Sequence, residues 1–189
     1  MSPNATQFGF DLEQPQFVNS EVIEIVQCTL ATLQTWANRG IIVPSGNAAP
    51  GNGRRRFYSA IDVCKVQILS RLTEFGFPPS DSKQIAEWVG ARIKSGRSIT
   101  KDHRLLITRK PFQLEVIGAP APTVTGLGDY FYQEFEGENQ VRHGVEHMYQ
   151  NLFSREDANE LIKLNLPFGA MVVKTMNTLR KLSGDEKPE

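Results

Sequence analysis

The chain has few cysteines, no long apolar run and no net charge, and each of these shortages excludes a class of protein. Its two cysteines, Cys28 and Cys64, lack the close spacing of metal ligands and lie in apolar helical patterns. We therefore expect small buried side chains there, rather than a disulfide or a metal sensor. No apolar run approaches the roughly 20 residues that a membrane span needs. Residues 1–15 are polar and acidic, without the basic-then-apolar order of a secretory signal, so we expect a cytoplasmic protein with no membrane partner.

The formal net charge of zero conceals an uneven distribution along the chain. Lys+Arg and Asp+Glu both number 21. Residues 17–116 contain 14 basic and 8 acidic residues, whereas residues 117–189 contain 7 basic and 11 acidic ones. Because positive charge attracts phosphates, we expect any nucleic-acid site in the basic part.

The basic part begins with the pattern of two short helices. Ser20 is placed to cap the first helix, and Gln27-Cys28 then turns the chain. Thr29 is placed to cap the second helix, because its hydroxyl can accept a hydrogen bond from a first-turn N–H that otherwise lacks a partner. Two short helices joined by a tight turn predict a helix-turn-helix.

The second helix has one apolar face and a defined end. Three residues at threefold spacing predict the buried face: Leu30, Leu33 and Trp36. Gly40 follows where a helix end favours a left-handed residue. The remaining side chains of this helix are therefore expected to point outward.

A glycine-rich segment separates this motif from two further helices. Residues 41–43 suit a strand, residues 44–53 are rich in Pro, Gly, Asn and Ala, and residues 54–58 suit a returning strand. The pattern predicts a hairpin, or wing. Ser59 and Asp62 form a capping box that starts a third helix, which ends at Gly76. Ser80 is placed to start a fourth helix that ends near Ser95.

Beyond Gly96 the pattern changes to short strands. Residues 104–108, 112–117 and 130–135 suit strands, and residues 165–167 can start a last helix. We therefore expect an α+β fold. Its expected parts are a disordered segment at 1–16, a helix-turn-helix domain at 17–96, a smaller mixed α/β unit at 97–182 and a flexible tail at 183–189.

Three stretches, in this order, resemble one known family. Residues 32–44, TLQTWANRGIIVP, resemble the recognition helix of the MerR family and its exit, which typically reads Leu-Arg-x-aromatic and then Gly-Leu-x-x-Pro. Residues 53–63, GRRRFYSAIDV, resemble the end of that family's wing and the helix start after it. Residues 72–77, LTEFGF, resemble its hydrophobic-glycine exit from the third helix. The resemblance covers the N-terminal domain only and implies a winged helix-turn-helix that binds double-stranded DNA.

The helical pattern and the resemblance together assign the candidate DNA contacts. Outward Thr, Gln and Asn side chains can hydrogen-bond base edges, and the small Ala31 permits close approach in the major groove. The nearby arginines are placed to meet phosphates, and Tyr58 would bond a phosphate or brace the wing. The candidates are Thr29, Ala31, Thr32, Gln34, Thr35, Asn38, Arg39, Arg54, Arg55, Arg56 and Tyr58.

The sequence departs from the family pattern in several places. Gln34 stands where the family has an arginine, which removes one phosphate anchor, and Ala37 replaces the usual acidic residue. The wing loop at 45–52 is longer than usual and uncharged. Family members commonly dimerise through a long antiparallel coiled coil after the fourth helix, whereas Gly96 follows that helix here.

Two other motifs allow different interpretations. His143, Glu146 and His147 match the H-x-x-E-H zinc pattern, but Gly144 weakens a helix there, and an exposed polar segment is the simpler interpretation. The aromatic stretch at 130–135 could line an effector pocket or cover the core of the smaller unit, and we favour the core. We expect no catalytic residue, no metal and no cofactor.

The sequence thus favours a sequence-specific transcription regulator, cytoplasmic and nucleoid-associated, that binds double-stranded DNA as a homodimer. The C-terminal unit would mediate dimerisation, contact with a partner such as the transcription machinery, or effector sensing. One alternative is an architectural DNA-binding protein of the excisionase or phage packaging type. Another is a winged-helix module for protein interaction, and an enzyme is the weakest alternative.

Overall fold

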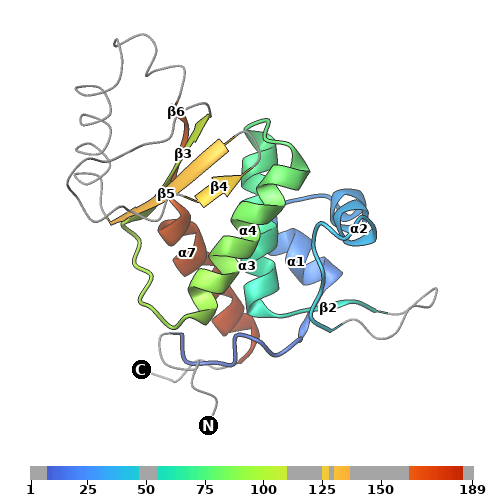
Figure 1. Ribbon diagram of the computed structural model, residues 1–189. Coiled ribbons are helices and arrows are strands. Elements are labelled where there is room, and N and C mark those ends of the chain that lie inside the picture. Colours follow the sequence, from blue (N-terminus) through green and yellow to red (C-terminus); the bar gives the residue numbers. More distant parts are fainter. Residues whose placement is uncertain (1–7, 47–54, 110–124, 128–129, 137–161, 185–189) are drawn as a thin grey trace, which may run out of the picture. The chain divides into compact units, whose positions relative to one another are not determined.

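The computed structural model describes residues 8–46, 55–109, 125–127, 130–136 and 162–184 (Figure 1). It divides into two compact units. One comprises Met1–Ile99 together with Met171–Glu189, and the other comprises Thr100–Ala170. Helices dominate the first unit and an antiparallel sheet dominates the second, so the expected α+β fold class is confirmed. The last helix groups with the N-terminal unit, whereas the sequence pattern assigned it to the C-terminal one.

The first unit contains two very short strands and five helices among its described residues. In chain order they are β1 (Phe17–Val18), α1 (Asn19–Val26), α2 (Leu30–Asn38), β2 (Phe57–Tyr58), α3 (Ala60–Glu74), α4 (Pro79–Lys94) and α7 (Phe168–Leu182), of which the unit holds the part from Met171. The strands pair antiparallel, with Phe17 opposite Tyr58 and Val18 opposite Phe57.

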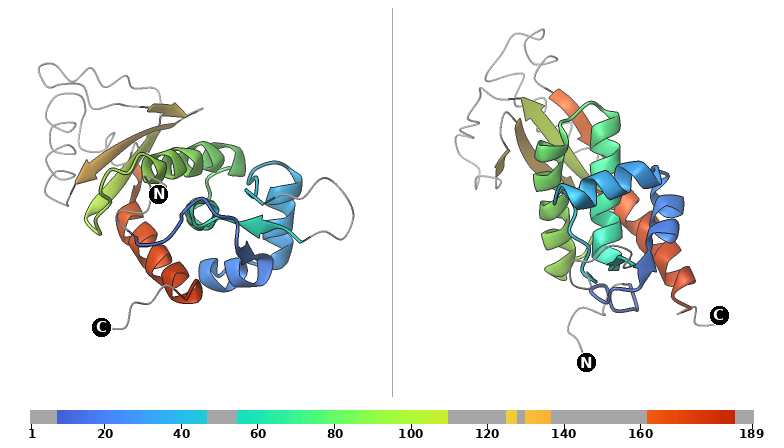
Figure 2. Two further views of the ribbon diagram at one scale, coloured as in Figure 1. Left: turned by 90° about the horizontal axis from the view of Figure 1, so that it is seen from below. Right: turned by 90° about the vertical axis from the view of Figure 1, so that its right-hand side faces the viewer.

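Helix α3 is the centre of this unit. Seen along its axis in Figure 2, it lies among α1, α4 and α7. Because it has neighbours on several sides, ten of its fifteen residues are buried. The fully buried side chains here include Leu33, Tyr58, Ile61, Ile68, Leu69, Leu72 and Ile85. This core holds the helix-turn-helix on a rigid support.

The helix starts follow the local sequence with two shifts. The α3 capping box is confirmed: Asp62 N–H donates to Ser59 Oγ at 3.2 Å, and Ser59 N–H donates to Asp62 Oδ2 at 3.0 Å. Ser20 is not a cap, because α1 already begins at Asn19 and the N–H before it, that of Val18, donates to Glu21 Oε2 at 2.8 Å. Helix α4 begins one residue before Ser80, at Pro79, a residue type suited to a first helical position because no N–H is needed there.

The strand expected at 41–43 is not formed. The N–H groups of Ile41 and Ile42 both donate to the Trp36 carbonyl, at 2.8 and 3.3 Å, and so extend the end of α2. The strand that pairs with β2 is instead β1, from before the first helix. One bond links the two flanks of the glycine-rich segment, from Gly46 N–H to the Phe57 carbonyl at 3.0 Å.

The segment before β1 also differs from expectation over its described part. Residues 1–16 were expected to be disordered, but Phe10 and Leu12 are buried and Ile61 N–H donates to the Leu12 carbonyl at 3.3 Å. Lys94 Nζ lies 2.9 Å from Glu13 Oε2. The two buried apolar side chains attach this segment to the core.

The second unit is built on a four-stranded antiparallel sheet in the order β4-β5-β3-β6. Its strands are β3 (His103–Arg109), β4 (Thr125–Leu127), β5 (Tyr130–Glu136) and β6 (Ile162–Leu166). The strands predicted at 104–108 and 130–135 are confirmed as β3 and β5. The expected helix start at 165–167 is wrong by up to three residues, because β6 continues to Leu166 and α7 begins at Phe168. The predicted strand at 112–117 lies outside the described residues.

Candidate nucleic-acid interface

Helices α1 and α2 form the helix-turn-helix. At the turn, Gln27 adopts a left-handed conformation with φ 60°, and its N–H donates to the Ile23 carbonyl at 2.8 Å. Thr29 then caps α2 as predicted, since its Oγ1 accepts a hydrogen bond from Thr32 N–H at 3.1 Å. At the other end Gly40 has φ +65°, the left-handed value expected of a residue that ends a helix.

Helix α2 has one buried face and one exposed uncharged face. Leu33 and Trp36 are buried as expected. Leu30 was expected beside them but is 43% exposed, because it occupies the first helical position, at the edge of the packed face. The candidate contacts Thr29, Ala31, Gln34, Thr35, Asn38 and Arg39 are exposed, and Thr32 is half-buried. No charged residue lies within α2, so this face offers only hydroxyls, amides and apolar groups.

The two described arginines of the wing end lie beside this face. Arg56 Nη2 donates to Asn38 Oδ1 at 2.6 Å, which links the residue before β2 to the last residue of α2. Arg55 is exposed. Arg54 lies outside the described residues, as does most of the wing loop. The pattern of the sequence did not reveal the Arg56–Asn38 bond, because it joins residues 18 positions apart.

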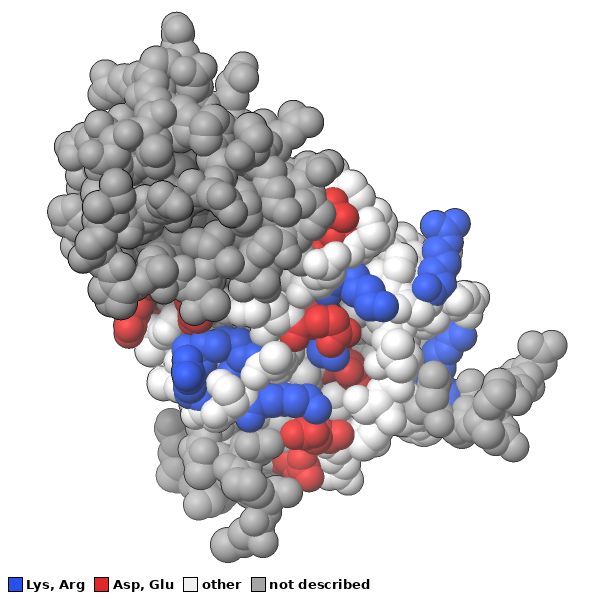
Figure 3. All heavy atoms as spheres, viewed as in Figure 1, with Lys and Arg blue, Asp and Glu red and all other residues white. Residues whose placement is uncertain are grey.

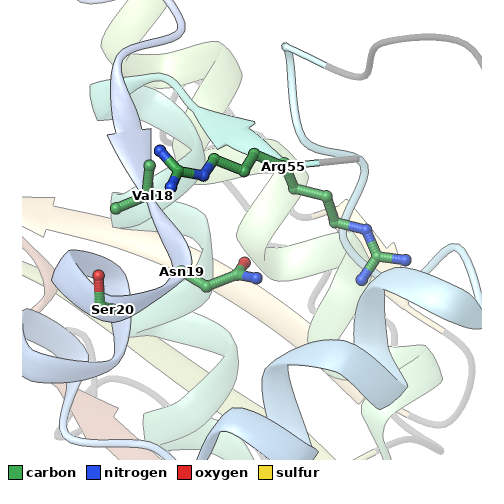
Figure 4. A pocket seen from close by; sticks show the side chains of 5 residues that line it. Val18, Asn19, Ser20 and Arg55 are labelled. Carbon is green, nitrogen blue, oxygen red and sulfur yellow. The ribbon is translucent and has the colours of Figure 1, made fainter. Parts of the chain in front are cut away.

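Arg55 and Arg56 also line a hollow of about 420 Å³ with Val18, Asn19 and Ser20 at the start of α1 (Figure 4). Asn19 Oδ1 is buried and has no hydrogen-bond partner within the described residues. The N-terminus of a helix and two guanidinium groups both favour an anion. Asn19 and Ser20 are therefore additions to the candidates named from the sequence.

Tyr58 is fully buried, which fits the bracing role and not direct contact with a phosphate. Burial raises the pKa of its hydroxyl to about 12, and the nearby Asp62 and Cys28 act in the same direction, against the opposing effect of Arg56. Within the described residues this hydroxyl has no hydrogen-bond partner. The buried ring of Tyr58 therefore holds β2, and with it the two preceding arginines, against the core.

Two contacts fix the segment that follows α2. Lys83 Nζ on α4 donates to the Gly40 carbonyl at 2.7 Å. Ser45 N–H donates to Asp62 Oδ2 at 2.9 Å, so one carboxylate oxygen holds both the start of α3 and the backbone at Ser45. These contacts position the exposed face of α2 relative to the arginines.

Lys and Arg side chains are spread over the face shown in Figure 3. Some lie at its right-hand edge, where α2 lies in the matching view of Figure 1, and others lie at the centre and the lower left, beside Asp and Glu. Cys28 is half-buried and Cys64 fully buried, and burial raises the pKa of both thiols. Both cysteines therefore favour the protonated form over the metal-binding thiolate.

The described residues offer no candidate metal site and no membrane-spanning helix. They contain no cluster of three or more His, Cys, Asp or Glu side chains able to hold a metal ion. Among the helices described, none is long and apolar enough to cross a membrane. The motif at 143–147 lies outside the described residues, and so do the side chains of the aromatic stretch on β5.

The fold and the exposed face define a helix-turn-helix domain of the DNA-binding class. Residues 19–87 match the model of the MerR HTH family regulatory proteins, over about a third of the chain. The N-terminal domain is therefore a MerR-like helix-turn-helix domain, of the kind found in DNA-binding transcription regulators. A comparison with curated proteins finds no match to the chain.

Proposed function

We propose that the protein is a sequence-specific regulator of transcription whose helix α2 enters the major groove of double-stranded DNA. Arg55 and Arg56 contact the backbone beside it, and the wing loop touches the backbone or the minor groove. The observation that carries the proposal is the joint position of the uncharged polar face of α2 and the hollow lined by both arginines. The first can read bases and the second can hold a phosphate.

The polar side chains of α2 and the arginines are assigned different roles because their chemistry differs. Gln34, Thr35 and Asn38 offer donors and acceptors of fixed geometry to base edges. The guanidinium groups and the start of α1 offer positive charge, which binds every sequence equally and fixes the orientation on the duplex. The proposed activity is thus binding, not catalysis, and it places the protein with the DNA in the cytoplasm.

The protein is proposed to act as a homodimer. A single module of this size covers little DNA, and two copies on adjacent half-sites multiply the affinity. The described part of α4 ends at Lys94, and Gly96 follows with φ +68°. A long coiled coil continuing α4 is thus absent from the described residues, so the dimer contact is assigned to the residues beyond it.

The proposal is tested by selecting bound sequences from a random duplex pool and then measuring the affinity for the selected site at several salt concentrations. The test variant is Arg55→Ala with Arg56→Ala. The matched control is Arg180→Ala with Lys181→Ala, which removes the same charge from exposed positions on α7. If two phosphate contacts are lost, the slope of log affinity against log salt falls by about two in the test variant only.

The possible results distinguish the proposed regulator from an architectural protein and from a protein-interaction module. A palindromic selected motif near promoters, bound with the expected salt slope, supports a dimeric regulator. Clustered sites with strong DNA bending would favour an architectural protein instead. Absence of any enriched duplex for the unmodified chain would overturn DNA binding and favour a protein-interaction module.

A further inference from the structure

The start of the recognition helix presents methyl groups rather than polar atoms. Leu30 and Ala31, its first two residues, are both exposed. The hydroxyls beside them are occupied: Thr29 Oγ1 accepts from Thr32 N–H and lies 2.8 Å from Thr32 Oγ1. In helix-turn-helix proteins the N-terminal residues of this helix contact the base edges. An apolar surface at that position matches the one apolar group in the major groove, the C5 methyl of thymine.

Within α2 no side chain is of the kind that reads guanine. Bidentate recognition of guanine uses Arg or Lys, and α2 contains neither; the exposed Arg39 follows the helix as its C-cap and is assigned to a phosphate. Asn and Gln pair with adenine instead. Asn38 Oδ1 already accepts a hydrogen bond from Arg56, so Gln34, whose side chain is exposed and has no hydrogen bond within the described residues, is the amide free for adenine.

We propose that this recognition face reads A·T base pairs, with Leu30 and Ala31 against thymine methyls and Gln34 bonded to adenine. The inference rests on the proposed DNA-binding function and names the class of site that it takes. A lone exposed leucine is ordinary on a protein surface. The one at position 30 is assigned a role because it begins the helix that enters the groove and stands on a face without charge.

The decisive experiment removes a single methyl from the DNA. In the selected duplex each thymine is replaced in turn by deoxyuridine, which lacks only the C5 methyl, and binding of the full chain is measured. We expect an A·T-rich half-site and about fourfold weaker binding at one or two thymines, the effect of removing one buried methyl. Leu30→Ala should lose most of that dependence on the methyl.

A matched control keeps the test specific to this position. Leu182→Ala removes an equally apolar side chain that is 53% exposed on α7, and it should retain the full uridine effect. Gln34→Ala should reduce discrimination against G·C at the one base pair that Gln34 reads. Discrimination at the other base pairs of the site should be unchanged. Should Leu30→Ala not fold, the uridine scan on the unmodified protein decides alone.

Failure of this inference differs from failure of the proposed function. A selected duplex with a G·C core, or an A·T core indifferent to uridine at every thymine, overturns the reading of A·T pairs while DNA binding stands. Selection of no duplex overturns both. A uridine effect that Leu30→Ala leaves unchanged overturns the assignment to Leu30.

Discussion

Replacing Asp62 with alanine is expected to destabilise the helix-turn-helix unit more than any other single change to a polar residue described above. The side chain is only 2% exposed, and its Oδ2 accepts two backbone bonds, from Ser59 N–H at 3.0 Å and Ser45 N–H at 2.9 Å. Alanine leaves both N–H groups without this acceptor. Hydrogen bonds to a charged group contribute about 1.5–3 kcal/mol each, so loss of the two should lower the free energy of unfolding by about 3–6 kcal/mol.

Asparagine at the same position gives a matched comparison. Both bonds end on one oxygen, so an amide oxygen placed there can still accept them, without the negative charge. The lost charge also removes a favourable interaction with the N-terminus of α3, which is about 0.3–1 kcal/mol. Asp62→Asn should therefore cost about 1 kcal/mol, clearly less than Asp62→Ala.

The chain contains its own probe for this measurement. Its two tryptophans, Trp36 and Trp88, both lie in the first unit, on α2 and α4. Urea unfolding followed by tryptophan fluorescence therefore reports that unit without the sheet. If the two variants lose equal stability, or if Asp62→Ala loses less than about 1 kcal/mol, the shared oxygen is not the anchor described here.

Three further predictions concern the same fold. Tyr58→Phe should leave stability at neutral pH nearly unchanged, because the buried hydroxyl has no partner within the described residues. Since folding raises the pKa of Tyr58 to about 12, its contribution is complete below pH 10 and is lost as pH rises toward 12, so a pH series of urea midpoints should fall less steeply for the variant. Gln27→Gly should raise the thermal midpoint by relieving a left-handed residue, a gain of about 0.5–1 kcal/mol, and a lower midpoint would contradict the turn geometry. In the second unit, Gly169→Ala would place a Cβ against the Thr100 carbonyl oxygen and 2.8 Å from His103 Cβ. The free energy of unfolding, measured by circular dichroism, should fall by at least about 2–3 kcal/mol.

Local chemistry explains which parts of the fold the sequence could predict. The Thr29 cap, the left-handed Gly40 and the Ser59 capping box depend on neighbouring residues alone, and all three are confirmed. The pairing partner of β2 depends on which distant segment reaches it. Residues 41–43 have a composition typical of a strand, but β1 is the strand that pairs with β2.

The candidate site shows the same division between local and distant information. The exposed face of α2 follows from helical periodicity, which predicted the exposure of Ala31, Gln34, Thr35 and Asn38. Thr32 is only half-exposed, and Leu30, predicted to be buried, is exposed. Periodicity gives the angle around a helix but not where packing stops along it, and Leu30 lies at the first position. The bond between Arg56 and Asn38 and the hollow beside α1 depend on tertiary structure, and no spacing in the sequence indicates them.

The overall neutrality of the chain is compatible with DNA binding because affinity and selectivity are assigned to different elements. Helix α2 carries no charge, so it contributes little to attraction at long range. In the proposed function the arginines beside β2 supply that attraction, and Arg56 is bonded to the last residue of α2. A phosphate bound by Arg56 would therefore also change the position of the Asn38 side chain, because the two side chains are hydrogen-bonded. Backbone contact and base reading are coupled through that single bond, so Arg56→Lys, which keeps the charge but loses the forked geometry, should reduce selectivity more than affinity.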